Sequence, residues 1–259
     1  MDWLYPLSGL VVGMIVGLTG VGGGSLMTPL LMLVFGISPA IAVGTDLLYA
    51  AFTKMGGSVA HHRRGTVQWN IVGRLALGSV PASIVTTVFL HWLGADATKF
   101  NSLITSSLGV ALILTAGAII FRARLAQYAA HDAAAKSGWR EKYIVQITIF
   151  TGVVLGVLVT ISSIGAGALG TVALFFLYPK FKPVNIVGTD IAHAVPLTLV
   201  AGLGHAAIGT VNWYLLASLL VGSLPGIWIG SHLSSRVPEK WLRTALATML
   251  LVIGGKFVF

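Results

Sequence analysis

The sequence predicts an all-α polytopic membrane protein with two inverted-topology repeats, each a broken (re-entrant-like) hairpin plus three spanning helices. The first observation is composition: 56% of the 259 residues are hydrophobic, only 9% are charged, and mean hydropathy is +0.92. Apolar stretches of membrane-spanning length recur along the whole chain. The second is that glycine-rich breaks interrupt two of these stretches, and the third is that the second half repeats the first.

The first half contains five apolar segments, which cover residues 3–19, 26–35, 41–59, 69–93 and 103–121. The break Gly20-Val21-Gly22-Gly23-Gly24-Ser25 separates the first two segments. Glycine permits tight turns, and irregular backbone survives at membrane depth only inside protein or beside a wet cavity. We therefore expect the first two segments to form one broken hairpin. Gly36-Ile37-Ser38-Pro39 predicts a turn after it, and Pro81 predicts a kink in the fourth segment.

The longest polar stretch, residues 122–142, divides the chain. We expect residues 1–121 to form the first transmembrane repeat, 122–142 a cytoplasmic linker loop, and 143–259 the second repeat. In the second half, Ser162-Ser163-Ile164-Gly165-Ala166-Gly167 breaks an apolar run. A helix restarting there would extend about 18 Å to Tyr178 at ~1.5 Å per residue, near half of a ~30 Å hydrocarbon core.

The duplication is visible as residues that recur at a fixed offset. At an offset of 144, the pairs are Pro39 and Pro183, Gly44-Thr45-Asp46 and Gly188-Thr189-Asp190, His61 and His205, Trp69 and Trp213, and Pro81 and Pro225. At an offset of 143, Gly13, Gly22, Gly24 and Thr28 pair with Gly156, Gly165, Gly167 and Thr171. Chance does not keep glycine, proline, tryptophan and the rare aspartate in register for so long.

The loop charges indicate that the two repeats have opposite orientations. Each type of loop is basic in one copy and nearly uncharged in the other, as the positive-inside rule requires of inverted copies. The basic loops lie at 61–66, 122–142, 178–183 and 236–243, and hold 12 of the 16 Lys and Arg. We place these loops in the cytoplasm and both termini outside. Lys54 and Arg74 flank the first loop, and we expect both to reach the same side.

The two breaks are the predicted anion site. A helix begins after each break, and a helix N-terminus offers unpaired N–H groups and a partial positive charge. Nearby hydroxyls add donors. The predicted substrate-binding residues are Gly22, Gly23, Gly24, Ser25, Thr28, Ser162, Ser163, Gly165, Gly167 and Thr171. The alternative is that the glycines only permit close helix packing.

Asp46 and Asp190 are the acids that lie well inside predicted spans, and they are repeat partners. An intramembrane acid is costly and therefore indicates function. With Thr45 and Thr189 they are our candidates for a coupling-ion site, for H⁺ or Na⁺. The alternative is a helix cap or another satisfied structural hydrogen bond.

Other function classes have little support in the sequence. His61 and His205 are more typical of helix ends at the interface than of ligands, while His193, three residues after Asp190, could form a proton relay with it. The chain has no cysteine, and no residue pattern indicates a metal site or a nucleophile with its base. We therefore expect no cofactor, no metal and no enzymatic activity. The net charge of +9 lies in short loops, which argues against nucleic-acid binding.

The sequence resembles the TauE/SafE family of sulfite and organosulfonate exporters. The residues that carry the resemblance are the first break with Pro29, the Gly44-Thr45-Asp46 stretch, its echo at Gly188-Thr189-Asp190, and the basic turn that ends at Gly65. The resemblance covers nearly the whole chain. It departs at the second break, where Ser162-Ser163 replaces glycines. It implies a bacterial inner-membrane secondary transporter for small sulfur-containing anions such as sulfite, sulfoacetate or related organosulfonates.

The resulting hypothesis is an exporter of such anions that works by alternating access, acts in the lipid bilayer, and is a monomer or homodimer. The alternative is a cation/proton antiporter whose main site is formed by Asp46 and Asp190.

Overall fold

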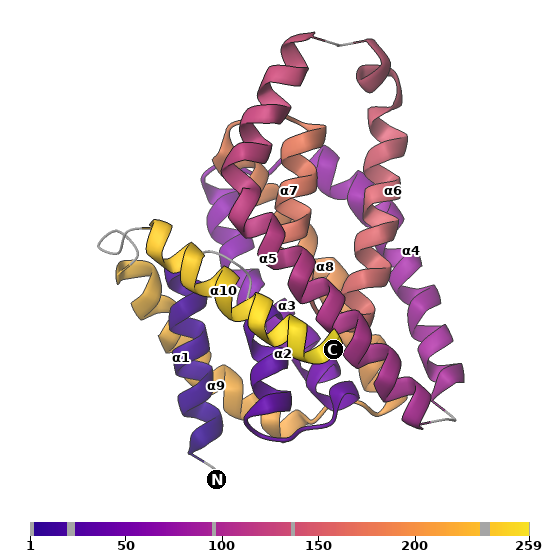
Figure 1. Cartoon of the computed structure of the whole chain (residues 1–259), viewed down its shortest axis with the longest axis vertical. Coiled ribbons are helices and arrows are strands. Elements are labelled where there is room, and N and C mark those ends of the chain that lie inside the picture. Colours follow the sequence, from indigo (N-terminus) through magenta and orange to yellow (C-terminus); the bar gives the residue numbers. More distant parts are fainter. Residues whose placement is uncertain (1–2, 20–23, 95–96, 136–137, 234–238, 259) are drawn as a thin grey trace.

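The computed structural model describes residues 3–19, 24–94, 97–135, 138–233 and 239–258, and within these ranges it consists of ten helices and no strands. The helices are α1 (Leu4–Thr19), α2 (Gly24–Leu33), α3 (Pro39–Arg63), α4 (Trp69–Leu93), α5 (Ala97–Ala135), α6 (Gly138–Ser162), α7 (Ala168–Leu177), α8 (Pro183–Ile208), α9 (Trp213–Leu233) and α10 (Glu239–Val258). Figure 1 shows them as one bundle with the helices inclined along its long axis.

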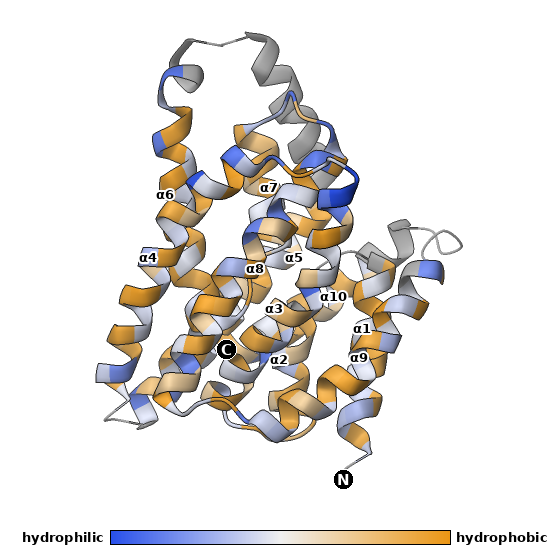
Figure 2. Cartoon of the chain, turned by 180° about the vertical axis from the view of Figure 1, so that it is seen from behind, coloured by the Kyte–Doolittle hydropathy of each residue, from blue (hydrophilic) through white to orange (hydrophobic). Residues whose placement is uncertain are grey.

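The helices have the length and composition of membrane spans. Segments of α4, α5, α6, α8 and α9 are each long and apolar enough to cross a bilayer. Large apolar side chains point outward, including Trp92, Val85 and Leu77, which are 76%, 68% and 67% exposed. Figure 2 shows apolar residues along the flanks of the bundle and hydrophilic residues gathered at its upper end. The prediction of a helical polytopic membrane protein is confirmed.

Two short helices return beside long ones. α2 and α7 have 10 residues each, about 15 Å of helix, and each follows a break after a longer helix. In Figure 1, α1 rises from the lower end and α2 returns to it, whereas α6 descends from the upper end and α7 returns upward. Of the other helices, α3, α4, α5 and α8 run along the bundle, α9 lies beside α1, and α10 crosses the bundle obliquely. The two hairpins therefore enter the bundle from opposite ends.

The stretch 122–142 differs from the expected loop. Residues 122–135 continue α5, which is 39 residues long, and α6 already begins at Gly138. The reason lies in its composition: this stretch is rich in alanine, the strongest helix former, and contains neither proline nor glycine before Gly138. The connection between the halves is thus made mainly of two helical extensions, which project at the top of Figure 1.

Glycines set the closest helix packing. A Cβ on Gly222 of α9 would lie 1.8 Å from the carbonyl oxygen of Pro6 on α1, and one on Gly78 of α4 would lie 2.0 Å from that of Ile149 on α6. Backbones approach this closely only where side chains are absent. Gly222 and Gly78 are repeat partners. The two seams, α1 with α9 and α4 with α6, flank a central pair formed by α3 and α8.

Candidate functional site

The second break is a tight turn with unusual backbone angles. Ser163 has φ +59°, which is uncommon for a residue with a side chain, and Gly165 and Gly167 have φ +122° and +139°. Strained residues of this kind concentrate at functional sites. Ser162 holds the turn, because its hydroxyl donates to the Leu158 carbonyl at 2.7 Å and accepts from the Ile164 N–H at 3.2 Å.

Ser163 differs from Ser162 in the hydrogen bonding of its hydroxyl. Its side chain is only 4% exposed, and its hydroxyl has no hydrogen-bond partner among the described residues. It lies beside the carboxyl group of Asp46 from the other half of the chain. Of the two predicted serines, Ser162 therefore stabilises the turn, whereas the Ser163 hydroxyl lies beside the Asp46 carboxyl group.

The first break is described only in part. Gly22 and Gly23 lie outside the described residues, as does the side chain of Ser25, while Gly24 begins α2. The start of α2 nevertheless lies close to the second break. Ile164, at the centre of that break, belongs to the same buried cluster as Leu26 and Met27 in the first turn of α2.

Each short helix carries a threonine that binds the aspartate of its own half. The Thr28 hydroxyl on α2 donates to Asp46 Oδ2 at 2.5 Å, and the Thr171 hydroxyl on α7 donates to Asp190 Oδ2 at 3.0 Å. Both aspartates are at most 1% exposed. Hydrogen bonds to a charged acceptor are about twice as strong as neutral ones. The structure thus joins the predicted threonines and aspartates into two equivalent Thr–Asp pairs.

The Gly-Thr-Asp stretches also lock each half to a turn of the other half. The Thr45 hydroxyl accepts from the N–H of Asn212 at 3.0 Å, and the Thr189 hydroxyl accepts from the N–H of Gln68 at 3.0 Å. Asn212 and Gln68 are themselves repeat partners. The hydroxyls predicted to bind a coupling ion are therefore engaged with the backbone of the opposite half.

The histidines are more buried than expected for the interface. His205 has no exposed surface, and its ring bonds the Thr210 hydroxyl at 2.8 Å and the Thr160 carbonyl at 3.0 Å. His61 makes the equivalent 2.8 Å bond to Thr66. His193 Nε2 bonds the Ser79 hydroxyl on α4 at 2.8 Å, and its Nδ1 has no hydrogen-bond partner among the described residues, so its ring makes no hydrogen bond to Asp190.

Lys54 is the residue that sequence reasoning missed. Instead of reaching the end of the molecule, it is 8% exposed, and its ammonium donates to the Ala166 carbonyl in the second break at 2.5 Å. Asp190 and Asp46 are the carboxylates that interact with it electrostatically. Its position in the sequence could have indicated this burial. Lys54 lies five residues before the end of the predicted segment 41–59, and a lysine inside a span is as costly as an aspartate.

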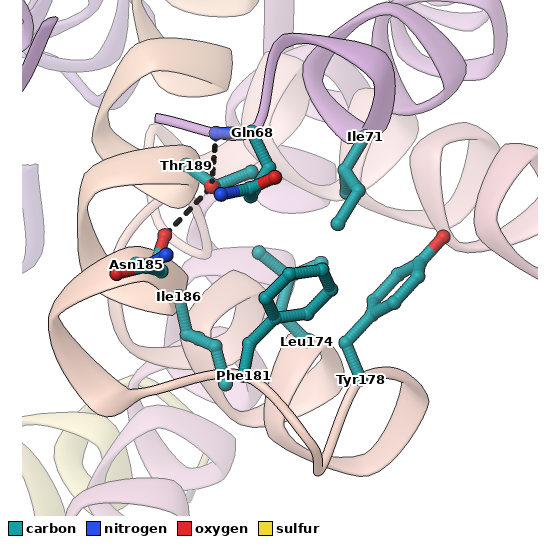
Figure 3. Close-up of a pocket in the computed structure, with 8 residues that line it drawn as sticks. All are labelled: Gln68, Ile71, Leu174, Tyr178, Phe181, Asn185, Ile186 and Thr189. Atoms are coloured by element: carbon teal, nitrogen blue, oxygen red, sulfur yellow. Dashed lines mark hydrogen bonds between the residues drawn. The ribbon is translucent and has the colours of Figure 1, made fainter. Parts of the chain in front are cut away.

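A narrow crevice lies among α4, α7, α8 and the turns beside them (Figure 3). Its empty volume, open solvent included, is about 170 Å³, and its lining residues are Gln68, Ile71, Leu174, Tyr178, Phe181, Asn185, Ile186 and Thr189. Figure 3 shows the rings of Tyr178 and Phe181 on one side and the Gln68–Thr189 contact on the other.

Comparison with known proteins identifies the family. The model described as "Sulfite exporter TauE/SafE" matches residues 5–257. The chain belongs to the TauE/SafE family. This TauE/SafE protein is 42% identical over 252 residues to the probable membrane transporter protein YjnA of Bacillus subtilis (strain 168), an alignment that covers 97% of this chain and 98% of that protein.

More distant relatives have the same description. The probable membrane transporter protein YdhB of B. subtilis is 26% identical, with 96% of this chain and 97% of that protein covered. MJ0441 of Methanocaldococcus jannaschii, also a probable membrane transporter protein, is 25% identical, with 97% and 93% covered. No solved structure matches the chain. The protein is thus a membrane transporter of the TauE/SafE family and not an enzyme, and the resemblance in the sequence is confirmed.

Proposed function

We propose that this TauE/SafE protein is a secondary transporter that exports small sulfur-containing anions across the bacterial inner membrane. Sulfite, sulfoacetate and related organosulfonates are the proposed substrates. The observation that carries the proposal is the meeting of a strained helix break with the two Thr–Asp pairs, which brings hydroxyls, a helix N-terminus and an ammonium to one buried place.

The anion site follows from the chemistry of these groups. A sulfite or sulfonate group presents three oxygens, each a hydrogen-bond acceptor. The buried Ser163 hydroxyl, the first N–H groups of α7 and the Lys54 ammonium are donors of the required kind, and helix N-termini attract anions. The residues of the first break, Gly22, Gly23, Gly24 and Ser25, are proposed as further donors on the basis of the sequence alone.

Alternating access is supported by the arrangement of the hairpins. They enter from opposite ends (Figure 1), and the two halves exchange equivalent contacts, Gln68 with Thr189 and Asn212 with Thr45. Two inverted repeats around one central site can expose it first to one side and then to the other. The narrow crevice beside Tyr178 and Phe181 is then the closed cytoplasmic approach.

Orientation can be tested directly because the natural chain has no cysteine. We predict that cysteines at His62 and Lys180, both exposed, react with a membrane-impermeant maleimide only from the cytoplasmic side. Cysteines at the exposed Val34 and Lys99 should react only from outside. Labelling of intact cells and of inverted vesicles measures this. Reaction of Val34→Cys and His62→Cys from the same side would contradict the proposed topology.

The substrate is tested with purified protein in proteoliposomes. We expect concentration-driven flux of at least one member of a panel containing sulfite, sulfate, thiosulfate and organosulfonates, with and without a pH gradient. Empty liposomes provide the background. If the vesicles move no panel anion but do exchange Na⁺ or K⁺ for protons, the proposed function is wrong.

That last outcome defines the second candidate, a cation/proton antiporter that uses Asp46 and Asp190. The observation that favours it is the carboxylate of Asp46, whose Oδ1 is buried and has no hydrogen-bond partner among the described residues. Such an oxygen could accept a proton or bind a cation. The two candidates differ in whether wild-type protein moves an anion at all.

A further inference from the structure

Lys54 crosses from the first half of the chain to the break of the second half. It lies on α3, whereas the carbonyl that it binds, Ala166, lies just before α7. The carboxylates that interact with its ammonium are Asp190 and Asp46, and His193 also lies within electrostatic range. The ammonium therefore binds the second break directly and interacts electrostatically with the aspartates of both halves.

The groups around this ammonium are those that transporters with broken helices use for a metal cation. Unwound backbone carbonyls and carboxylates coordinate Na⁺ in such sites, because Na⁺ prefers oxygen ligands. A lysine ammonium carries the same charge and has three N–H donors, one of which binds the Ala166 carbonyl. An uncompensated buried ammonium would be very costly, so its place is fixed by these partners.

The repeat shows that this cation is present once. The counterpart of Lys54 is Thr198, which is uncharged and fully buried, and its hydroxyl donates to the Ala194 carbonyl of its own helix at 2.8 Å. The threonine–aspartate pairs occur in both halves, whereas the ammonium occurs in one. The single ammonium therefore serves both halves of the site, whereas each half has its own threonine–aspartate pair.

We propose that the Lys54 ammonium takes the place of a coupling Na⁺ between the second break and the two aspartates, so that transport by this protein requires no sodium. The proposal rests on the proposed function for its transport assay. Lys54 is a positioning residue in it: the ammonium holds the Ala166 carbonyl and balances the carboxylates while the anion is bound.

The first test uses unaltered protein. Flux of the panel anion should be the same when all Na⁺ is replaced by N-methylglucamine on both sides of the proteoliposome membrane. A requirement for Na⁺ would overturn the proposal. If no panel anion crosses at all, the proposed substrates fail, and the proposal on Lys54 is then decided by the binding measurement below.

The second test removes the ammonium. Lys54→Ala should lower flux by about a hundredfold, because it leaves buried carboxylates uncompensated. Ammonium or methylammonium should restore at least part of the loss, whereas tetramethylammonium, which has no N–H, should not. Lys256→Ala, at an exposed lysine on α10, is the matched control and should keep wild-type flux. Full flux of Lys54→Ala in the absence of amines would contradict the proposal.

Binding gives a readout that needs no transport. Ammonium should raise the melting temperature of detergent-solubilised Lys54→Ala but not that of wild type, because a ligand stabilises the state that binds it. Sodium should leave the melting temperature of wild type unchanged. If Lys54→Ala does not insert, Lys54→Gln, which keeps a donor for Ala166, should lose flux while Lys54→Arg retains part of it. Equal flux in both variants would overturn the proposal.

Discussion

Asp190→Asn should lower anion flux by about a hundredfold in proteoliposomes while the protein still inserts. Asparagine keeps the size of the side chain and an oxygen for the Thr171 hydroxyl, which now donates to Asp190 Oδ2 at 3.0 Å. It removes a charge that interacts electrostatically with Lys54. Leaving a buried charge uncompensated costs about 3–5 kcal/mol, and about 1.4 kcal/mol corresponds to a factor of ten.

The controls separate charge from hydrogen bonding. Thr171→Val removes the hydroxyl but keeps the charge, so it should reduce flux much less than Asp190→Asn. Asp46→Asn tests the other half, where Thr28 makes the equivalent 2.5 Å bond. Initial rates at equal reconstituted protein are the measurement. Wild-type rates in Asp190→Asn would exclude this carboxylate from the transport cycle.

The same variants distinguish the two candidate functions. If the aspartates couple protons to anion movement, the double variant with Asn at positions 46 and 190 should lose accumulation driven by a pH gradient. Its exchange of labelled anion for unlabelled anion should be no faster than that of Asp190→Asn, but it should stay above the empty-liposome background, because the helix N-terminus and Ser163 remain. In a cation/proton antiporter, the double variant should lose cation exchange, and wild type should show no anion exchange to begin with.

Much of this architecture could be predicted from patterns that repeat. The breaks, the aspartates and the duplicated turns are visible because proline and aspartate are rare inside the spans and recur, together with glycine, at offsets of 143 or 144. The alanine-rich stretch after Phe121 is ambiguous in sequence, because its high helix propensity favours a helix whereas its loss of apolar character favours a loop. It is helical up to Ala135.

The pairing of Lys54 could not be predicted in the same way. A lysine near the end of a predicted span usually extends to the interface, and only the fold brings the second break to it. The burial of His205 has a similar cause: its partners are the turn residue Thr210 and the Thr160 carbonyl of α6. Contacts between the two halves depend on how the halves pack against each other. The offset between repeat partners in the sequence does not predict that packing.

The Gly-Thr-Asp stretch combines three tasks in three successive residues. Glycine admits the turn of the other half, threonine binds the backbone of that turn, and aspartate binds the threonine of the short helix in its own half. Each stretch therefore connects the hairpin of one half to the helix pair of the other. A movement of either hairpin would therefore shift contacts in the opposite half. The proposed alternating access requires such a connection between the halves.

Gly44→Ala, which adds one methyl group, should disrupt this connection more than the addition of a methyl group at any other position of the stretch. The added Cβ would lie 2.4 Å from the Thr210 carbonyl oxygen, 3.0 Å from its hydroxyl and 3.1 Å from His205 Cβ. The nearest of these atoms belongs to backbone, so the turn between α8 and α9 must shift. Overpacking of this kind costs about 1–3 kcal/mol. We expect a lower melting temperature and a loss of most anion flux.

Gly73→Ala is the matched control, since a Cβ there would meet no atom within 4 Å. Alanine in a helix interior is favoured over glycine by about 0.5–1 kcal/mol, so Gly73→Ala should melt at or above the wild-type temperature and keep its flux. The contrast isolates the contact from the general effect of replacing glycine.

Gly188→Ala extends the comparison to the other half, where the nearest atom is His61 Nδ1 at 2.7 Å, on a side chain that can rotate away. It should therefore be less damaging than Gly44→Ala, and equal melting temperatures for Gly44→Ala and Gly73→Ala would show that the turn is not held against α3 as described.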